Sequence, residues 1–156
     1  VDLYKNPINH GGIDYIMIIK WRPEYSCYDK TIDEQHMKMI DMINEMNELS
    51  QYDEHIDRYD KILEIFSGLK DYAVYHFGYE EKMFKEHDYD SFNTKLQILE
   101  HKGFVNKIES IDLYELDEKQ NETIADVLDF LSKWLDHHIL QIDKKFGEFL
   151  KEKYEK

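Results

Sequence analysis

The fold is decided by the stretch from Tyr72 to Met83, which reads YAVYHFGYEEKM. It lies within a longer segment, about 57–86, in which apolar residues recur every three or four positions, as on one face of an α-helix. His76 and Glu80 interrupt this apolar face four residues apart, so both are expected to point into a helical core. Burying such groups without partners costs roughly 2–7 kcal/mol each, so the pair requires a compensating interaction.

Three other segments show the same apolar spacing. They cover about 31–46, 91–108 and 124–149, and polar connections, including residues 112–120, separate them. Thr31 with Glu34 matches a capping box and predicts the start of the first helix, and Ser91 is the expected cap of the third.

Four amphipathic helices joined by short connections predict an all-α fold, an antiparallel up-down four-helix bundle with an N-terminal arm. Residues 1–20, which contain Pro7 and two glycines, are expected to form the arm or the remnant of a linker, and residues 21–156 the bundle. The first residue is Val1 rather than Met, which favours a domain cut from a longer protein.

Polar side chains occupy inward positions on all four predicted helices. They are His36, His76, Glu80, Gln97, His101 and His138. One buried histidine is ordinary in a protein core, but six polar residues on four facing helices are typical of a metal site inside a bundle. Imidazole and carboxylate ligands without thiolates favour iron or manganese over structural zinc. This many ligands favours two ions bridged by carboxylates over a single ion.

Several neighbouring residues receive weaker support from the pattern. Asp143 follows His138 by five residues, which fits one helical face poorly, so spacing alone does not select it. Glu81 is rotated by about 100° from Glu80 and is expected to face solvent. Outside the apolar pattern lie His10, His55 and His137, which are expected at the surface.

Composition excludes several other classes of protein. A net charge of -14 argues against binding to nucleic acid or to an anionic membrane surface. The single cysteine, Cys27, allows no disulfide within the chain and is expected to be an inert thiol in a reducing, cytoplasmic setting. The apolar run 13–19 is too short to span a membrane, so no membrane insertion is expected.

The motifs resemble those of the hemerythrins, in particular the bacterial ones (bacteriohemerythrins), over about 130 residues from Trp21 to around Leu150. They occur in order along the chain: Trp21-Arg-Pro-Glu-Tyr25, Ile32-Asp-Glu-Gln-His36, the stretch Tyr72 to Met83, His101-Lys-Gly-Phe104, and Trp134-Leu-Asp-His-His138-Ile139 followed by Asp143.

The resemblance implies an oxo- or hydroxo-bridged pair of iron ions that binds dioxygen reversibly. By position, His36 and His76 would bind one iron, which keeps an open site for dioxygen. His101 and His138 would bind the other, and Glu80 and Asp143 would bridge the two.

One position departs from the family pattern. Gln97 stands where the family has another histidine ligand. Three outcomes are open: Gln97 coordinates weakly, water replaces the missing nitrogen, or the second iron is bound less tightly. Five residues flank the implied ligands and form either ordinary core or a dry oxygen pocket: Ile40, Phe77, Trp134, Leu135 and Ile139.

Three functions follow as hypotheses. The first is a non-haem di-iron domain that binds or senses dioxygen or a related small oxidant, fused to or partnered with a signalling module as in bacterial relatives. The second is a di-iron oxidase or peroxidase, favoured by the altered ligand at Gln97. The third is a plain helical bundle that has lost its metal.

Overall fold

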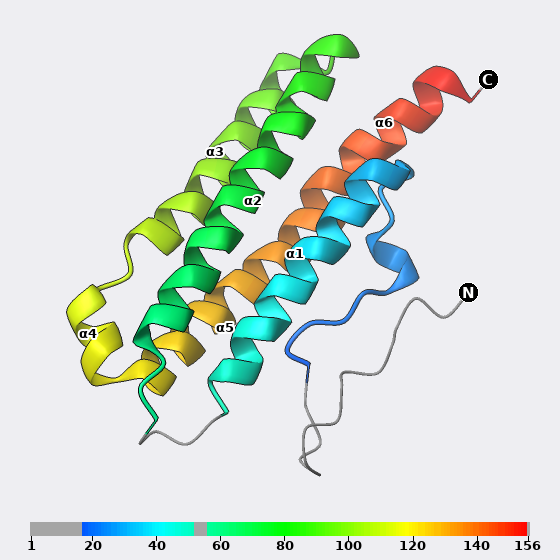
Figure 1. Cartoon of the computed structure of the whole chain (residues 1–156). Coiled ribbons are helices and arrows are strands. Elements are labelled where there is room, and N and C mark those ends of the chain that lie inside the picture. Colours follow the sequence, from blue (N-terminus) through cyan, green and yellow to red (C-terminus); the bar gives the residue numbers. More distant parts are fainter. Residues whose placement is uncertain (1–16, 52–55, 156) are drawn as a thin grey trace.

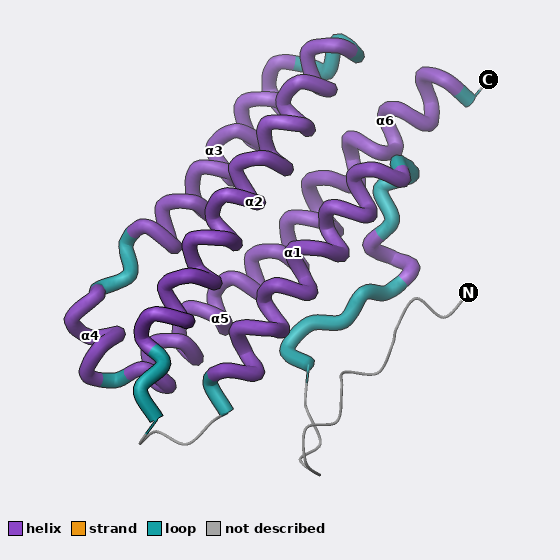
Figure 2. The backbone as a smooth tube through the Cα atoms, in the orientation of Figure 1, coloured by secondary structure: helices purple, strands orange, loops and turns teal. Residues whose placement is uncertain are grey.

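The computed structural model describes residues 17–51 and 56–155, and every regular element in these ranges is helical. Figures 1 and 2 show long helices packed side by side, with the short α4 at one end. A 3-10 turn and a π turn complete the elements, which are Pro23–Tyr25 (3-10), α1 (Lys30–Leu49), α2 (Tyr59–Glu86), α3 (Ser91–Glu109), α4 (Leu113–Glu118), α5 (Gln120–His138), Ile139–Asp143 (π) and α6 (Lys144–Tyr154).

The predicted all-α four-helix bundle is confirmed. The helix α5 continues through the π turn into α6 as one long rod, which forms the bundle with α1, α2 and α3. Within the bundle, α1 packs against α2 and α5, and α3 packs against the same two helices. None of the described helices is both long enough and apolar enough to span a membrane.

Two predicted helix caps were wrong by one or two residues. Asp29, not Thr31, caps α1, and its carboxylate accepts a hydrogen bond from the backbone N–H of Ile32 at 2.9 Å. Asp90, not Ser91, caps α3 in the same way. Aspartate competes with serine and threonine for this position, so the sequence alone did not decide between neighbours. The connection predicted over 112–120 contains the short helix α4.

The segment 17–29 forms a strap across the bundle. Asn44 on α1 holds it at one end, since its side chain accepts the N–H of Ile18 at 3.0 Å and donates to the carbonyl of Ile19 at 2.7 Å. Tyr25 holds it further along by donating its hydroxyl hydrogen to Asp136 on α5. Most of the predicted N-terminal arm, residues 1–16, lies outside the described residues.

Candidate metal centre

Six polar side chains meet in the centre of the bundle, and each is at most 2% exposed. They come from every long helix: His36 from α1, His76 and Glu80 from α2, His101 from α3, His138 from the end of α5 and Asp143 from the π turn. The structure therefore brings together the five ligand candidates that helical spacing selected and Asp143, which only the family resemblance indicated.

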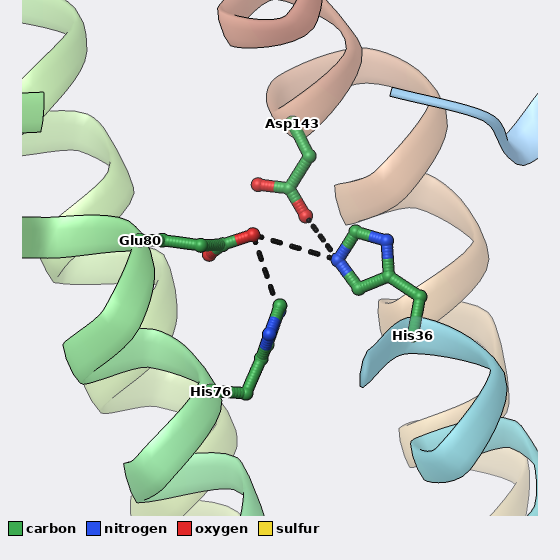
Figure 3. A group of neighbouring side chains, drawn as sticks. All are labelled: His36, His76, Glu80 and Asp143. Atoms are coloured by element: carbon green, nitrogen blue, oxygen red, sulfur yellow. Dashed lines mark ion pairs between the residues drawn. The ribbon is translucent and has the colours of Figure 1, made fainter. Parts of the chain in front are cut away.

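Glu80 lies between three of these histidines. Its Oε1 is 3.1 Å from Nε2 of His76 and 3.5 Å from Nε2 of His36, and its Oε2 is 3.1 Å from Nε2 of His101. Figure 3 shows the carboxylate reaching from α2 toward His36, and Asp143 approaching the same ring nitrogen from another helix.

Asp143 is the second shared carboxylate. Its Oδ2 is 3.0 Å from Nε2 of His36, and its Oδ1 is 3.1 Å from Nε2 of His138. The potential ligand atoms thus form two groups of four, each with all atoms within 4.8 Å of one another. One group contains His36 and His76, the other His101 and His138, and both contain Glu80 and Asp143.

Ring nitrogens and carboxylate oxygens that point into the cluster lack hydrogen bonds within the described residues, as expected of metal ligands. In the described part of the chain, the Nε2 atoms of all four histidines make no hydrogen bond, although they are buried. The same holds for one oxygen each of Glu80 and Asp143. Buried polar atoms without hydrogen bonds are costly, and imidazole nitrogens with carboxylate oxygens are the donors that iron takes in bundles of this kind. The cluster therefore fits two metal ions that share both carboxylates.

The outer nitrogens of three histidines face oxygen acceptors. Nδ1 of His76 is 2.7 Å from Oε1 of Gln35 and Nδ1 of His101 is 2.9 Å from Oε1 of Glu81, both within hydrogen-bond distance. Nδ1 of His138 is 3.6 Å from Oε2 of Glu100 and makes no hydrogen bond in the described part of the chain. Such partners fix the orientation and the tautomer of a metal-binding ring, leaving Nε2 free for the ion.

These outer acceptors were not all expected from the sequence. Glu81 was predicted to face solvent, and its side chain is indeed 36% exposed, yet it reaches back to His101. Gln35 and Glu100 were missed altogether. Each stands directly before a ligand histidine in the sequence, and that adjacency was the only available signal.

Gln97 occupies the inward position that the sequence indicated, at 1% exposure. Its Nε2 donates a hydrogen bond to Oδ1 of Asp143 at 3.0 Å, while its buried amide oxygen accepts no hydrogen bond from the described residues. The amide is therefore a direct neighbour of the shared carboxylate and belongs to the His101 and His138 side of the cluster.

Asp143 reaches the cluster because of the π turn. The backbone N–H of Lys144 donates to the carbonyl of Ile139, five residues earlier, instead of four as in an α-helix. This wider turn brings Asp143 onto the face that carries His138. It also shifts the apolar stripe of the helix, so that Phe146 is buried while Ile142 is only half-buried.

Aromatic rings cover the His101 and His138 side. The ring of Phe77 stacks on His101 with centroids 4.0 Å apart, and Trp134 stacks on His138 at 4.3 Å. All five residues considered for an oxygen pocket are buried except Trp134, which is half-buried; the other four are Ile40, Phe77, Leu135 and Ile139. His137 is exposed as expected, and His10 and His55 lie outside the described residues.

The cluster strongly perturbs its own protonation. Burial alone would raise the pKa of Glu80, but His76, His101 and His36 hold that pKa well below its usual value. Burial lowers the pKa of His36, but the Asp143 carboxylate, 3.0 Å from its Nε2, more than offsets this together with Glu80, so that the pKa is raised well above the usual value. Burial raises the pKa of the nearby Cys27 thiol to about 11, so the thiol keeps its hydrogen at neutral pH.

Comparisons with known proteins agree with this geometry. Residues 28–150 match the Hemerythrin HHE cation binding domain. A bacteriohemerythrin of Clostridium acetobutylicum is 35% identical over 126 residues, which are 81% of this chain and 96% of that protein. A bacteriohemerythrin of Pseudomonas aeruginosa is 27% identical over 79% of this chain and 75% of its own length. A third bacteriohemerythrin, from Stenotrophomonas maltophilia, is 24% identical over 86% of this chain and 82% of its own length.

Proposed function

Because the chain belongs to the hemerythrin family, we propose that it holds two non-haem iron ions in the buried cluster and there binds dioxygen or a related small oxidant. The observation that carries this proposal is the convergence of four buried Nε2 atoms without hydrogen bonds, one from each long helical rod, on two shared carboxylates. Iron bound there would supply the electrons that reduce the oxidant.

The two ions would have different protein surroundings. His36 and His76 would hold one iron and His101 and His138 the other, with Glu80 and Asp143 between them. The first iron has the smaller set of neighbouring ring stacks, whereas Phe77 and Trp134 cover both histidines of the second. We assign the oxidant to the first iron, on the side of His36 and His76, as the resemblance to the hemerythrins implies.

A second candidate function, a di-iron oxidase or peroxidase, is favoured by Gln97. A neutral amide is a poorer ligand than imidazole, and here its nitrogen already donates to Asp143. The iron held by His101 and His138 would then have one strong protein ligand fewer than the family pattern provides and would exchange more readily. This asymmetry favours turnover or sensing over long-term storage of the oxidant.

The proposal is tested by metal analysis together with visible spectra of the oxidised, reduced and oxygenated forms. Two irons per chain and an oxygenated band that reverses under vacuum are expected. Steady consumption of dioxygen or peroxide with a reductant would instead identify the oxidase or peroxidase. Iron near zero in a folded protein grown with ample iron would overturn both functions.

Two adjacent histidines provide a matched pair of variants. His138 is 1% exposed and faces Asp143, while His137 is exposed and faces solvent. The variant His138→Ala is expected to lose iron from its half of the site, whereas His137→Ala should keep the iron content and spectrum of the parent. Equal iron content in the two variants would contradict the ligand assignment.

Location and partners are also proposals. The buried thiol of Cys27 suits a reducing compartment, and we propose the cytoplasm. A signalling partner or fused signalling module would read out the oxidant, and co-purification from cells grown with and without oxygen tests for such a partner.

A further inference from the structure

Cys27 lies beside an iron-ligand candidate that lacks an outer acceptor. The thiol is 1% exposed, and its sulfur, a carboxylate oxygen of Asp33 and a ring nitrogen of His36 all lie within 4.8 Å of one another. Nε2 of His36 faces Asp143 and Glu80, so the nitrogen on the side of Cys27 is Nδ1. Figure 3 shows this second nitrogen of His36 pointing away from both carboxylates.

His36 differs in this respect from the other three histidines of the cluster. Nδ1 of His76 and Nδ1 of His101 are hydrogen-bonded to the side-chain oxygens of Gln35 and Glu81, and Nδ1 of His138 lies 3.6 Å from Oε2 of Glu100, too far for a hydrogen bond. Nδ1 of His36 is fully buried and makes no hydrogen bond within the described residues. The Cys27 sulfur therefore stands where the other rings have a side-chain oxygen.

The strap holds Cys27 firmly in this place. Its backbone N–H donates to Oδ1 of Asp33 at 2.8 Å, and the hydroxyl of Ser26 donates to Oδ2 of the same carboxylate at 2.7 Å. Gly147 on α6 packs against the Cys27 backbone so closely that any Cβ there would collide with the Cys27 carbonyl. Asp33 lies one turn before His36 on α1, so the same helix positions both the thiol and the ring.

We propose that Cys27 is a positioning residue whose sulfur accepts the Nδ1–H of His36. When Nε2 of His36 binds a metal ion, or when the ring is an imidazolium, Nδ1 carries a hydrogen, which then needs an acceptor. The thiol has its own hydrogen directed to the carbonyl of Tyr25, with sulfur and oxygen 3.4 Å apart, so its lone pairs remain available.

This hydrogen bond would make the histidines unequal as metal donors. Its consequence for the metal rests on the proposed function. Sulfur is a weaker acceptor than a carboxylate or amide oxygen, so it polarises the ring less. His36 would thereby be a weaker donor to the metal than His76 and His101, whose Nδ1 atoms are hydrogen-bonded to oxygens.

The first test needs no iron. Histidine labelled with ¹⁵N reports the Nδ1–H of His36 by NMR in protein prepared without metal. The signal is expected to exchange slowly with water in the parent and in Cys27→Ser, which keeps an acceptor. In Cys27→Val, whose side chain fills a similar volume but offers no acceptor, the Nδ1–H signal should shift upfield or disappear because the hydrogen exchanges rapidly with water. An unchanged signal in Cys27→Val would overturn the proposal.

The second test measures iron affinity by competition with a chelator. Cys27→Val is expected to weaken iron binding by about tenfold, the lower end of the range for lost outer partners, while Cys27→Ser stays close to the parent. If Cys27 acts only by packing, the order reverses, because valine fills the space and serine does not. If Cys27→Val fails to fold, Cys27→Ala replaces it in both tests.

The two proposals fail in different ways. Parent protein that binds no iron refutes the di-iron function, while the NMR test still decides the hydrogen bond. Parent protein that binds iron with the affinity of Cys27→Val refutes the role of Cys27 alone.

Discussion

His138 and Asp143 are five residues apart in the sequence, yet Nε2 of His138 lies 3.1 Å from Oδ1 of Asp143. In a continuous α-helix, residues at this spacing point about 140° apart and would not share a face. The π turn Ile139–Asp143 removes the difference because it spreads one turn over more residues. The extra residue in this turn therefore places Asp143, the second shared carboxylate, beside His138.

Deleting Gln141, which is exposed within the π turn, is expected to be tolerated. The turn can then close as a regular α-helix, in which His138 and Asp143 stand four apart and still share a face. Helix content by circular dichroism and iron content should stay near those of the parent.

A deletion in regular helix provides the control. Removing the exposed Asp129 from α5 rotates everything after it by about 100°, which turns His138 and Asp143 out of the interior. This variant is expected to lose both iron and stability. If the two deletions are equally damaging, the π turn is not the source of the alignment.

The sequence revealed the part of the site that follows α-helical periodicity. His36, His76, Glu80, His101 and His138 each interrupt an apolar stripe, and that stripe also indicated the four-helix bundle that the structure confirms. Asp143 breaks the period, so only the family resemblance pointed to it, since no local signal in the sequence marks a π turn.

The outer acceptors escaped prediction for a different physical reason. Gln35 and Glu100 each lie beside the apolar stripe of their helix, one residue before a ligand histidine. A charged or amide residue at such a position ordinarily faces solvent. Only the packing of neighbouring helices shows that they face a histidine on another helix. Spacing within one helix contains no information about such contacts.

Replacing Gln97 tests its effect on the second iron. Gln97→His supplies an imidazole and is expected to slow loss of iron from the His101 and His138 half and to prolong the oxygenated form. Gln97→Leu removes the hydrogen bond to Asp143 at similar volume and should weaken iron binding by about tenfold. Chelator competition and stopped-flow spectra measure both effects. If Gln97→Leu has the iron affinity and the spectra of the parent, Gln97 has no role in the site.

Glu81 is expected to support His101 despite its partial exposure. Glu81→Ala removes the acceptor of His101 Nδ1 and should lower iron affinity by about 10–100-fold, while Glu81→Gln keeps an acceptor and should lose less. Glu86→Ala on the same helix is the control, because Glu86 contacts only the surface residue Lys82 among the ion pairs of the described chain. A loss of affinity in the Glu86 variant would point to a general effect of charge.

Protein prepared without iron is expected to lose stability as the pH rises. Burial lowers the pKa of His138, but Asp143 and Glu100 outweigh this and raise it from 6.5 to about 9. A raised pKa stabilises the fold fully below the unfolded value and loses this contribution as the pH passes through the folded value. The loss should therefore extend from pH 6.5 to about 9 and amount to at most about 3 kcal/mol for His138.

Urea unfolding at a series of pH values measures this loss. The variant His138→Gln should flatten the slope in this range, and iron should abolish most of it, because the metal replaces the proton on Nε2. A denaturation midpoint that is constant from pH 6.5 to 9 would contradict the assigned interactions of His138.

Gly147 is expected to be intolerant of a side chain. In Gly147→Ala the new Cβ would overlap the backbone carbonyl of Cys27, so the strap or α6 must shift, at a cost of about 1–3 kcal/mol. The thiol of Cys27 should then become reactive toward a thiol reagent. Gly78→Ala is the matched control, since nothing lies within 4 Å of its Cβ and alanine should stabilise the helix by about 1 kcal/mol.

The contacts of Glu80 with His36, His76 and His101 join three helices through side chains alone. In iron-free protein, hydrogens on the imidazoles would make the same contacts with this carboxylate and would hold the three helices together. Each iron ion that enters would displace the hydrogens carried by the imidazole nitrogens, so uptake of iron would release protons. Its speed would be governed by how often the helices part wide enough to admit an ion, so that affinity and loading rate are separate properties of this protein.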